Sequence, residues 1–197
     1  MSQNSSIIVS FMGVDGSGKS TLIELLRKKL KNKFRKIKYI HLRPYLILLD
    51  KSTVQTNPHK SKKTWPILLN FFRILYWLII YRFFFYLFGN NSNQLIIFDR
   101  YAHDLMIDPI RYKFNLPINI AKFILDLFPN PNLWIVVNAP IKVLEKRKKE
   151  LPTKELKRQI RTYLNFAKQR KNLIIINTNR SVKDSLSRII KNINSIT

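Results

Sequence analysis

The chain has 197 residues and no cysteine, and 36 Lys and Arg against 11 Asp and Glu give it a formal net charge of +25. This length predicts one domain with a sizeable core, and the lack of cysteine excludes disulfides and cysteine-ligated metal sites. Such a charge favours anionic partners: nucleotides, phosphorylated substrates, nucleic acid or acidic lipid surfaces. Residues 1–6 are polar and do not resemble a signal peptide, so we expect a cytoplasmic protein.

The first predicted elements are an apolar strand, Ile7–Met12, and a helix with apolar residues at helical spacing over 22–30. Between them, residues 13–21 read Gly-Val-Asp-Gly-Ser-Gly-Lys-Ser-Thr and fit the phosphate-binding pattern Gly, four residues, Gly, Lys, Ser/Thr. Glycines let backbone N–H groups point at phosphate oxygens, and the helix start adds a positive dipole. In this pattern Lys19 reaches the β- and γ-phosphates and the Ser20 hydroxyl ligates Mg²⁺. The predicted nucleotide-binding residues in this loop are Gly13, Asp15, Gly16, Ser17, Gly18, Lys19, Ser20 and Thr21.

Four more apolar runs rich in Ile or Val predict strands at 37–42, 95–99, 133–138 and 173–177, with helical patterns between them. This alternation indicates βαβ units and a parallel sheet that is covered by helices on both faces. Ligands of such sheets bind beyond the carboxyl ends of the strands, so the residues that follow each strand are the candidates.

Several charged or polar residues occupy these strand ends. Arg43 follows the second strand and could bind a substrate phosphate, although an ordinary surface arginine is equally compatible with the sequence. Asp99 ends the third strand, where a carboxylate commonly anchors Mg²⁺, and Arg100 beside it would face the transferring phosphates. Asn177 ends the fifth strand, beside the expected position of the nucleotide base. Five residues after Arg100 could line an acceptor pocket, or serve as helix caps and in surface salt bridges: His103, Asp104, Asp108, Arg111 and Tyr112.

Residues 67–88 predict a helix that is apolar almost all round, with Pro66 before it and Gly89 after it. As a helix this segment would span roughly 33 Å, enough to cross a bilayer. Arg73 and Arg82 interrupt it on opposite sides, and each would cost a few kcal/mol near the bilayer centre. Three interpretations remain, in this order: a central helix of the domain, a dimer interface, or a membrane-surface helix.

The stretch 142–161 is strongly basic and follows the fourth predicted strand. In a phosphoryl transferase, a mobile lid at this place supplies positive charge to the transition state. Arg147, which lies nearest the strand end, is the best candidate, while a solvated helical face explains most of the lysines.

Residues 11–21 and Phe98-Asp99-Arg100-Tyr101 resemble the thymidylate kinase family of the nucleoside monophosphate kinases. The resemblance implies one P-loop kinase domain over residues 1–197, a three-layer α/β sandwich with a five-stranded parallel sheet in the order 2-3-1-4-5. It also implies that ATP and Mg²⁺ bind, that Asp15 organises Mg²⁺ or an acceptor hydroxyl, that Arg100 binds phosphate, and that Arg73 holds an acceptor phosphate.

The acceptor side departs from this family. Residues 102–108, Ala-His-Asp-Leu-Met-Ile-Asp, replace the Ser-Ser and Tyr-Gln groups with which thymidylate kinases read thymine. An Arg-Glu-Pro element is reduced to Arg43-Pro44, and the lid lacks the family's Gly and Arg-x-Glu features. This pattern resembles thymidylate-kinase-like proteins associated with surface-polysaccharide pathways.

We therefore expect an ATP-dependent phosphotransferase whose acceptor is a small molecule, phosphorylated or not, other than thymidylate. The alternatives are a genuine thymidylate kinase with an atypical acceptor site, and an ATP-binding protein drawn to nucleic acid or an anionic membrane. A homodimer and peripheral membrane contact remain open, whereas the absence of an aromatic-basic motif disfavours nucleic acid. The expected catalytic residues are Lys19, Arg100, Arg147 and Asp15. The expected Mg²⁺ ligands are Ser20 and Asp99. The expected substrate contacts are Arg43, Arg73, Arg100, His103 and Asp104.

Overall fold

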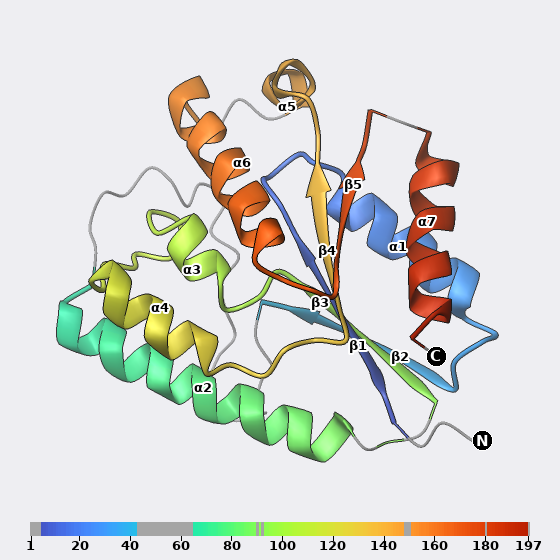
Figure 1. The fold of residues 1–197 in the computed structure, drawn as a ribbon, viewed down its shortest axis with the longest axis horizontal. Coiled ribbons are helices and arrows are strands. Elements are labelled where there is room, and N and C mark those ends of the chain that lie inside the picture. The colour runs from blue at the N-terminus through green and yellow to red at the C-terminus, as the bar shows by residue number, and fades with distance from the viewer. Residues whose placement is uncertain are drawn as a thin grey trace.

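The structure is a computed structural model that describes residues 5–42, 65–89, 91, 93–147, 151–179 and 181–196. Within these residues, five strands form one parallel sheet: β1 (Ile7–Met12), β2 (Lys36–His41), β3 (Gln94–Asp99), β4 (Leu133–Asn138) and β5 (Leu173–Asn177). Their order is β2-β3-β1-β4-β5, which confirms the expected order 2-3-1-4-5 (Figure 1).

In the described part of the chain, seven helices accompany the sheet (Figure 1). They are α1 (Lys19–Leu30), α2 (Ile67–Gly89), α3 (Asp104–Ile107), α4 (Ile118–Asp126), α5 (Ile141–Arg147), α6 (Thr153–Lys168) and α7 (Val182–Asn194). The expected lid stretch 142–161 therefore comprises most of α5 and the first half of α6, with residues 148–150 outside the described part.

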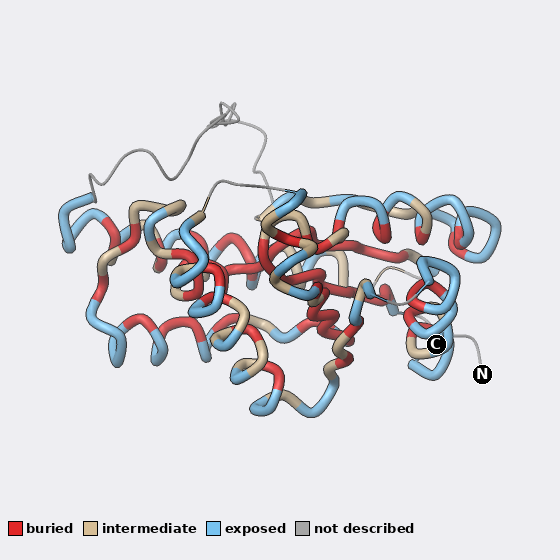
Figure 2. Tube along the Cα trace, turned by 90° about the horizontal axis from the view of Figure 1, so that it is seen from above, coloured by how far each residue is buried: buried red, intermediate tan, exposed pale blue. Residues whose placement is uncertain are grey.

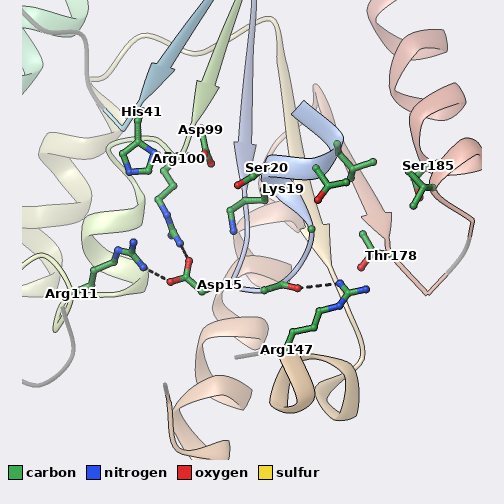
Figure 3. Close-up of a pocket in the computed structure, with 15 residues that line it drawn as sticks. Asp15, Lys19, Ser20, His41, Asp99, Arg100, Arg111, Arg147, Thr178 and Ser185 are labelled. Atoms are coloured by element: carbon green, nitrogen blue, oxygen red, sulfur yellow. Dashed lines mark hydrogen bonds and ion pairs between the residues drawn. The ribbon is translucent and has the colours of Figure 1, made fainter. Parts of the chain in front are cut away.

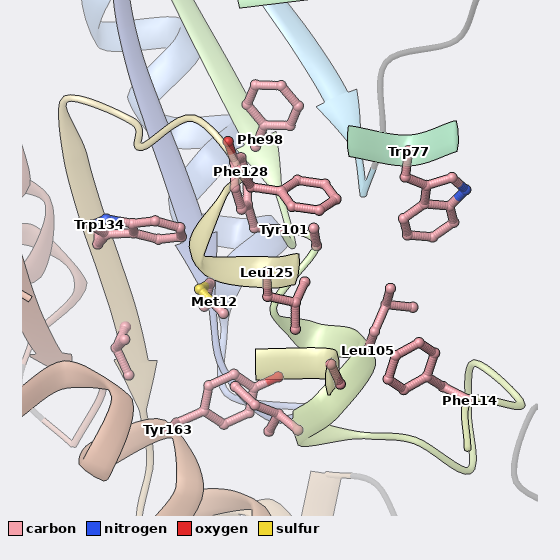
Figure 4. Close-up of a cluster of buried hydrophobic side chains, with 14 of the residues drawn as sticks. Met12, Trp77, Phe98, Tyr101, Leu105, Phe114, Leu125, Phe128, Trp134 and Tyr163 are labelled. Carbon is pink, nitrogen blue, oxygen red and sulfur yellow. The ribbon is translucent and has the colours of Figure 1, made fainter. Parts of the chain in front are cut away.

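Successive strand residues point to opposite faces, and this divides the core into two layers. On one face, Val9 and Phe11 of β1 pack with Leu26 of α1 and Ile189 of α7. On the other face, Ile8 and Met12 belong to a cluster with α2, α3, α4 and α6. Aromatic rings dominate this second cluster, which Figure 4 shows. Figure 2 shows the strands buried in the middle of the molecule, between helices whose outward sides are exposed.

The parallel register places the functional ends of three strands at one edge of the sheet. Phe11 of β1 pairs with Asp99 of β3, and Asp99 pairs with His41 of β2. The carboxyl ends of β1, β2 and β3 therefore lie side by side, as the sequence predicts for a cleft at this edge.

The helix predicted over 67–88 is α2, which extends to Gly89. It has the length and apolar composition of a membrane span, and it is the one such helix among the described residues. Its inner side packs in the core through Ile74, Trp77 and Tyr81. This packing agrees with the first of the three interpretations, a long helix that covers the sheet.

Candidate functional site

A cavity of about 540 Å³ lies at the carboxyl edge of the sheet, between the loop after β1 and the helices α5 and α7 (Figure 3). The structure brings together most of the residues that the sequence predicts for the phosphate donor. The predicted residues that line the cavity are Asp15, Gly16, Gly18, Lys19, Ser20, Thr21, Asp99, Arg100 and Arg147.

The loop after β1 turns sharply on three glycines. Gly13, Gly16 and Gly18 have φ angles of 141°, 79° and 97°, a region that side-chain-bearing residues rarely adopt. A Cβ atom on Gly13 would also lie only 2.3 Å from the carbonyl oxygen of Val137 in β4. The loop is therefore held close to the sheet, and it delivers the chain directly into α1 at Lys19.

Lys19 is buried at the floor of this loop. Its Nζ donates hydrogen bonds of 2.8 Å to the carbonyl oxygens of Gly13 and Val14. Burial lowers the pKa of Lys19 to about 7, and the positive charge of Arg100 lowers it in the same direction. An anion in the loop would favour the charged ammonium, so this lysine is poised to respond to phosphate.

Asp99 and Ser20 form a site that fits Mg²⁺. Asp99 Oδ2 accepts a 2.9 Å hydrogen bond from the Tyr39 hydroxyl and lies 3.6 Å from Nδ1 of His41. Its other oxygen, Oδ1, is buried without a hydrogen-bond partner among the described residues. Ser20 lines the same cavity. In the described part of the chain, no group of three or more His, Cys, Asp or Glu side chains could hold a metal ion. One carboxylate and one hydroxyl, completed by phosphate and water oxygens, are the set that Mg²⁺ takes in nucleotide sites.

Asp99 is ionised at neutral pH. Burial raises the pKa of Asp99, but the His41 ring, the Lys19 charge and the Tyr39 hydroxyl outweigh burial and bring the pKa below its ordinary value. The free Oδ1 atom is therefore a charged oxygen, which suits a cation or a cation-bound water.

Arg100 adopts an uncommon backbone conformation at the end of β3. Its φ is 76°, in the left-handed region that is strained for a residue with a side chain. Its own N–H donates to the Phe11 carbonyl at 2.8 Å, which fixes this conformation against β1. The guanidinium is 3 % exposed and pairs with Asp15 in the phosphate loop.

Asp15 also pairs with Arg111, so one carboxylate lies between two arginines at the cavity (Figure 3). This arrangement leaves a surplus of positive charge at the side of the loop opposite α5. On the other side, Arg147 of α5 donates a 3.2 Å hydrogen bond to the Gly16 carbonyl oxygen. Basic groups thus approach the loop from both sides.

Asp104 lies behind Arg100 and outside the cavity lining. It is fully buried and accepts hydrogen bonds from the Tyr101 backbone N–H at 2.9 Å and from the Tyr163 hydroxyl. Its Oδ1 is 3.4 Å from Arg100 Nη1. The structure therefore gives Asp104 contacts that position Arg100 and join α3 to α6.

His103 is also placed away from the cavity. Its ring stacks on Tyr101 with centroids 5.9 Å apart and packs against Trp134 and Phe166. Burial lowers the pKa of His103 to about 3, and the Arg170 charge contributes to this shift. A neutral histidine inside an aromatic cluster has no direct access to a substrate in the cavity, so we do not retain it among the substrate contacts.

The remaining predicted contacts lie at the margins. Arg73 does not line the cavity; it donates to the Tyr112 carbonyl at 3.0 Å, and its guanidinium lies 5.0 Å from the centroid of the Trp65 ring. Asn177 is exposed at the end of β5, and the next residue, Thr178, lines the cavity instead. Arg43 lies outside the described residues.

Five residues that line the cavity were not predicted as site residues: Leu22, His41, Thr178, Val182 and Ser185. His41 and Thr178 stand at strand ends, and that rule could have identified them. Arg111, a candidate for the acceptor pocket from the sequence, does line the cavity. It belongs to an irregular segment after α3, and no local pattern places it opposite Asp15.

Comparison with known proteins defines the fold. No protein-family model and no curated protein matches the sequence. Among solved structures, thymidylate kinase from Candida albicans matches with a TM-score of 0.65 and 16 % identity over 97 % of this chain and 92 % of that chain. Thymidylate kinase from Ehrlichia chaffeensis matches with a TM-score of 0.60 and 17 % identity, covering 94 % and 97 % of the two chains.

Deoxyadenosine kinase from M. mycoides, solved with dCMP and dCDP, matches with a TM-score of 0.58 and 18 % identity over 97 % of this chain and all of that chain. The fold is that of the P-loop nucleotide kinases. In a P-loop kinase fold the phosphate donor occupies the loop after β1, and here that loop borders the 540 Å³ cavity.

Proposed function

We propose that this chain is an ATP-dependent phosphotransferase that transfers the γ-phosphate of ATP to a small-molecule acceptor other than thymidylate. One observation carries the proposal: the glycine loop with Lys19, the free carboxylate oxygen of Asp99 and the guanidinium of Arg100 meet in one cavity. The fold similarity to thymidylate and deoxynucleoside kinases supports it.

Each residue has a role in charge neutralisation and positioning, which are the main demands of phosphoryl transfer. Lys19 and Arg100 stabilise negative charge that develops on the transferred group. Ser20 and Asp99 hold Mg²⁺, which would neutralise the β- and γ-phosphate oxygens when bound. Arg147 adds charge from α5, where its contact with Gly16 already places it beside the loop.

In our proposal, the residues on the acceptor side differ from those of a thymidylate-binding site. Asp15, fixed between Arg100 and Arg111, orients the attacking group of the acceptor, and the two arginines favour an acceptor that carries negative charge. Asp104 acts through Arg100 as a positioning residue. The thymine-reading groups are absent from residues 102–108, which is the reason for proposing another acceptor.

Acceptor-dependent ADP release tests this proposal. A panel of nucleoside monophosphates, nucleosides and sugar phosphates is supplied with ATP and Mg²⁺, with thymidylate included. We expect at least one acceptor to exceed thymidylate, and Lys19→Ala to lower its rate by at least about a hundredfold. Lys28→Ala is the matched control, because Lys28 is exposed on the same helix and its 2.7 Å salt bridge is to the exposed Glu24.

The other outcomes separate the alternatives. If thymidylate is the best acceptor, the chain is a thymidylate kinase with an atypical acceptor site. If ATP binds but no acceptor raises ADP release, the chain is an ATP-binding protein of another class and the proposed phosphotransferase activity is wrong. Normal turnover by the Lys19→Ala protein would contradict the assigned site.

A further inference from the structure

An open groove of about 560 Å³ lies between the end of α1 and the edge strand β2, and it shares no lining residue with the cavity of the candidate site. It lies on the side of the sheet that α1 and α7 cover, whereas α2, α4 and α6 pack on the opposite face (Figure 1). Four cations and one acid line this basic groove: Arg27, Lys28, Lys31, Arg35 and Glu24. Lys28 already pairs with Glu24 at 2.7 Å, so the groove carries a clear excess of positive charge.

The positive charge here exceeds what the end of a helix explains. The helix macrodipole favours cations in the last turn, where α1 has Arg27, Lys28 and Lys29. The basic run continues beyond the helix, and residues 27–38 contain no acidic residue. Four of the cations that follow α1 are exposed: Lys31, Lys33, Arg35 and Lys36. Like charges gathered in one place repel each other in the folded chain, and an anionic partner would relieve this repulsion.

Tyr39 of β2 adds an aromatic ring beside these cations. The guanidinium carbon of Arg27 lies 5.7 Å from the centroid of the Tyr39 ring. Tyr39 is 43 % exposed, and it is the one exposed large apolar side chain that the structure describes between residues 5 and 42. Because side chains alternate along a strand, Tyr39 lies on the same face of β2 as Ile37, which lines the groove. Only the fold brings the ring among these cations, since Arg27 and Tyr39 belong to different elements.

A strand of nucleic acid fits this combination better than a lipid surface does. Proteins bind single-stranded nucleic acid in a positively charged groove that follows the phosphates, with aromatic side chains on which the bases stack. A membrane-surface site combines cations with several apolar side chains that enter the lipid, and here Tyr39 alone is exposed. A concave groove also suits a chain of phosphates more than it suits the flat surface of a bilayer.

We propose that the basic groove between α1 and β2 binds single-stranded nucleic acid, with Arg27, Lys31 and Arg35 against backbone phosphates and Tyr39 stacked on a base. Binding of this kind depends little on sequence, because every base offers an aromatic face. The groove is a second site, separate from the cavity of the candidate site. The proposal is therefore independent of the proposed phosphotransferase activity, and it is tested without ATP or an acceptor.

Fluorescence anisotropy on the full chain tests the proposal, with a fluorescein-labelled DNA strand of mixed sequence and about 20 nucleotides as the probe. We expect binding that weakens roughly fiftyfold between about 50 and 200 mM salt, as the neutralisation of about four phosphates predicts. The combined Arg27→Gln, Lys31→Gln and Arg35→Gln protein should bind at least about tenfold more weakly. Its plot of log affinity against log salt should be shallower by about two, because three phosphate contacts are lost.

Two controls separate the groove from general charge and the ring from its hydroxyl. Replacing Lys157, Arg161 and Lys168 by Gln removes the same charge from exposed positions of α6, on the opposite face, and should change the affinity by less than about twofold. Tyr39→Leu should weaken binding at least about fivefold, whereas Tyr39→Phe, which keeps the ring but loses the hydrogen bond to Asp99, should bind as the unmodified protein does. Circular dichroism on each variant establishes that it is folded.

Three results would overturn the proposal. One is no binding of the DNA strand even at low salt. Another is an equal loss of affinity in the groove and α6 variants, since binding would then follow the net charge of the chain. The third comes from vesicles of equal parts phosphatidylcholine and phosphatidylserine: if the protein binds them through the same cations and does not bind the DNA strand, an anionic lipid surface is the partner of this groove.

Discussion

At the scale of single residues, Asp15 controls how much positive charge the cleft presents. It pairs with Arg100, which is 3 % exposed, and with Arg111, which is more accessible. A buried guanidinium that loses a carboxylate partner retains its desolvation cost, so the carboxylate contributes to folding as well as to binding. When Asp15 is neutralised, Arg100 keeps its longer contacts to Asp104 Oδ1 at 3.4 Å and to the Tyr163 hydroxyl at 3.5 Å.

We predict that Asp15→Asn lowers the free energy of unfolding by about 1–3 kcal/mol, because two cations then lack their shared anion. Bound ATP should restore part of this loss by supplying negative charge. Urea unfolding with and without nucleotide measures both effects. The matched control is Asp126→Asn, which removes an exposed pair with Arg170 and should cost less than about 1 kcal/mol. Equal losses in the two variants would contradict this role of Asp15.

The pKa of Lys19 makes a second residue-scale prediction. Because burial lowers the folded-state pKa to about 7, Lys19 is largely neutral at pH 8, and a bound phosphate would return it to the charged form. ATP binding should therefore take up close to one proton at pH 8 and almost none at pH 6, where Lys19 is already charged. Calorimetry in buffers of different ionisation enthalpy measures this uptake. Lys19→Met should abolish this proton uptake. Unchanged proton uptake in this variant would contradict the assignment of the uptake to Lys19.

At the scale of elements, the boundaries that were predicted well have local causes. Pro66 precedes α2 and Gly89 is its last residue, so the structure moves the predicted end by one residue only. The strands β4 and β5 begin and end as predicted because they are short runs of Ile and Val between turn residues. Strand β2 was predicted at 37–42 but spans Lys36–His41, since an edge strand tolerates lysine and Leu42 turns into the left-handed region at φ 62°.

The start of α7 offers a stability test at this scale. The Ser181 hydroxyl accepts a 3.0 Å hydrogen bond from the Asp184 backbone N–H, as expected of an N-cap. We predict that Ser181→Ala lowers the free energy of unfolding by about 1 kcal/mol. Ser187→Ala is the matched control, because Ser187 is exposed inside the same helix, where alanine is at least as favourable. A loss in the control equal to that in the cap variant would contradict the assignment.

At the scale of the whole molecule, the donor half of the site is more predictable than the acceptor half. The loop from Gly13 to Thr21 is contiguous, and its chemistry can be recognised from spacing alone. Arg111 meets Asp15 across 96 positions of sequence, and only the fold brings them together. His103 was predicted as a substrate contact, but its ring is buried among aromatic side chains. Polar and apolar residues are mixed around the short α3, so the sequence does not indicate this burial.

Several conclusions at this scale stay predictions. The resemblance to proteins of surface-polysaccharide pathways, the cytoplasmic location and a homodimer rest on sequence alone. The P-loop kinase fold rests on the sheet order and on the matched structures. Together with the cavity, that fold makes phosphoryl transfer from ATP the central claim.

Following the γ-phosphate itself tests this claim most directly. ATP labelled in its γ-phosphate is incubated with Mg²⁺ and the acceptor that gives the highest ADP release, and the products are separated. We predict that the label moves to the acceptor in equal amount to the ADP formed, and that Lys19→Ala abolishes this transfer. Label that appears only as inorganic phosphate, or remains on ATP with every acceptor, would contradict the account.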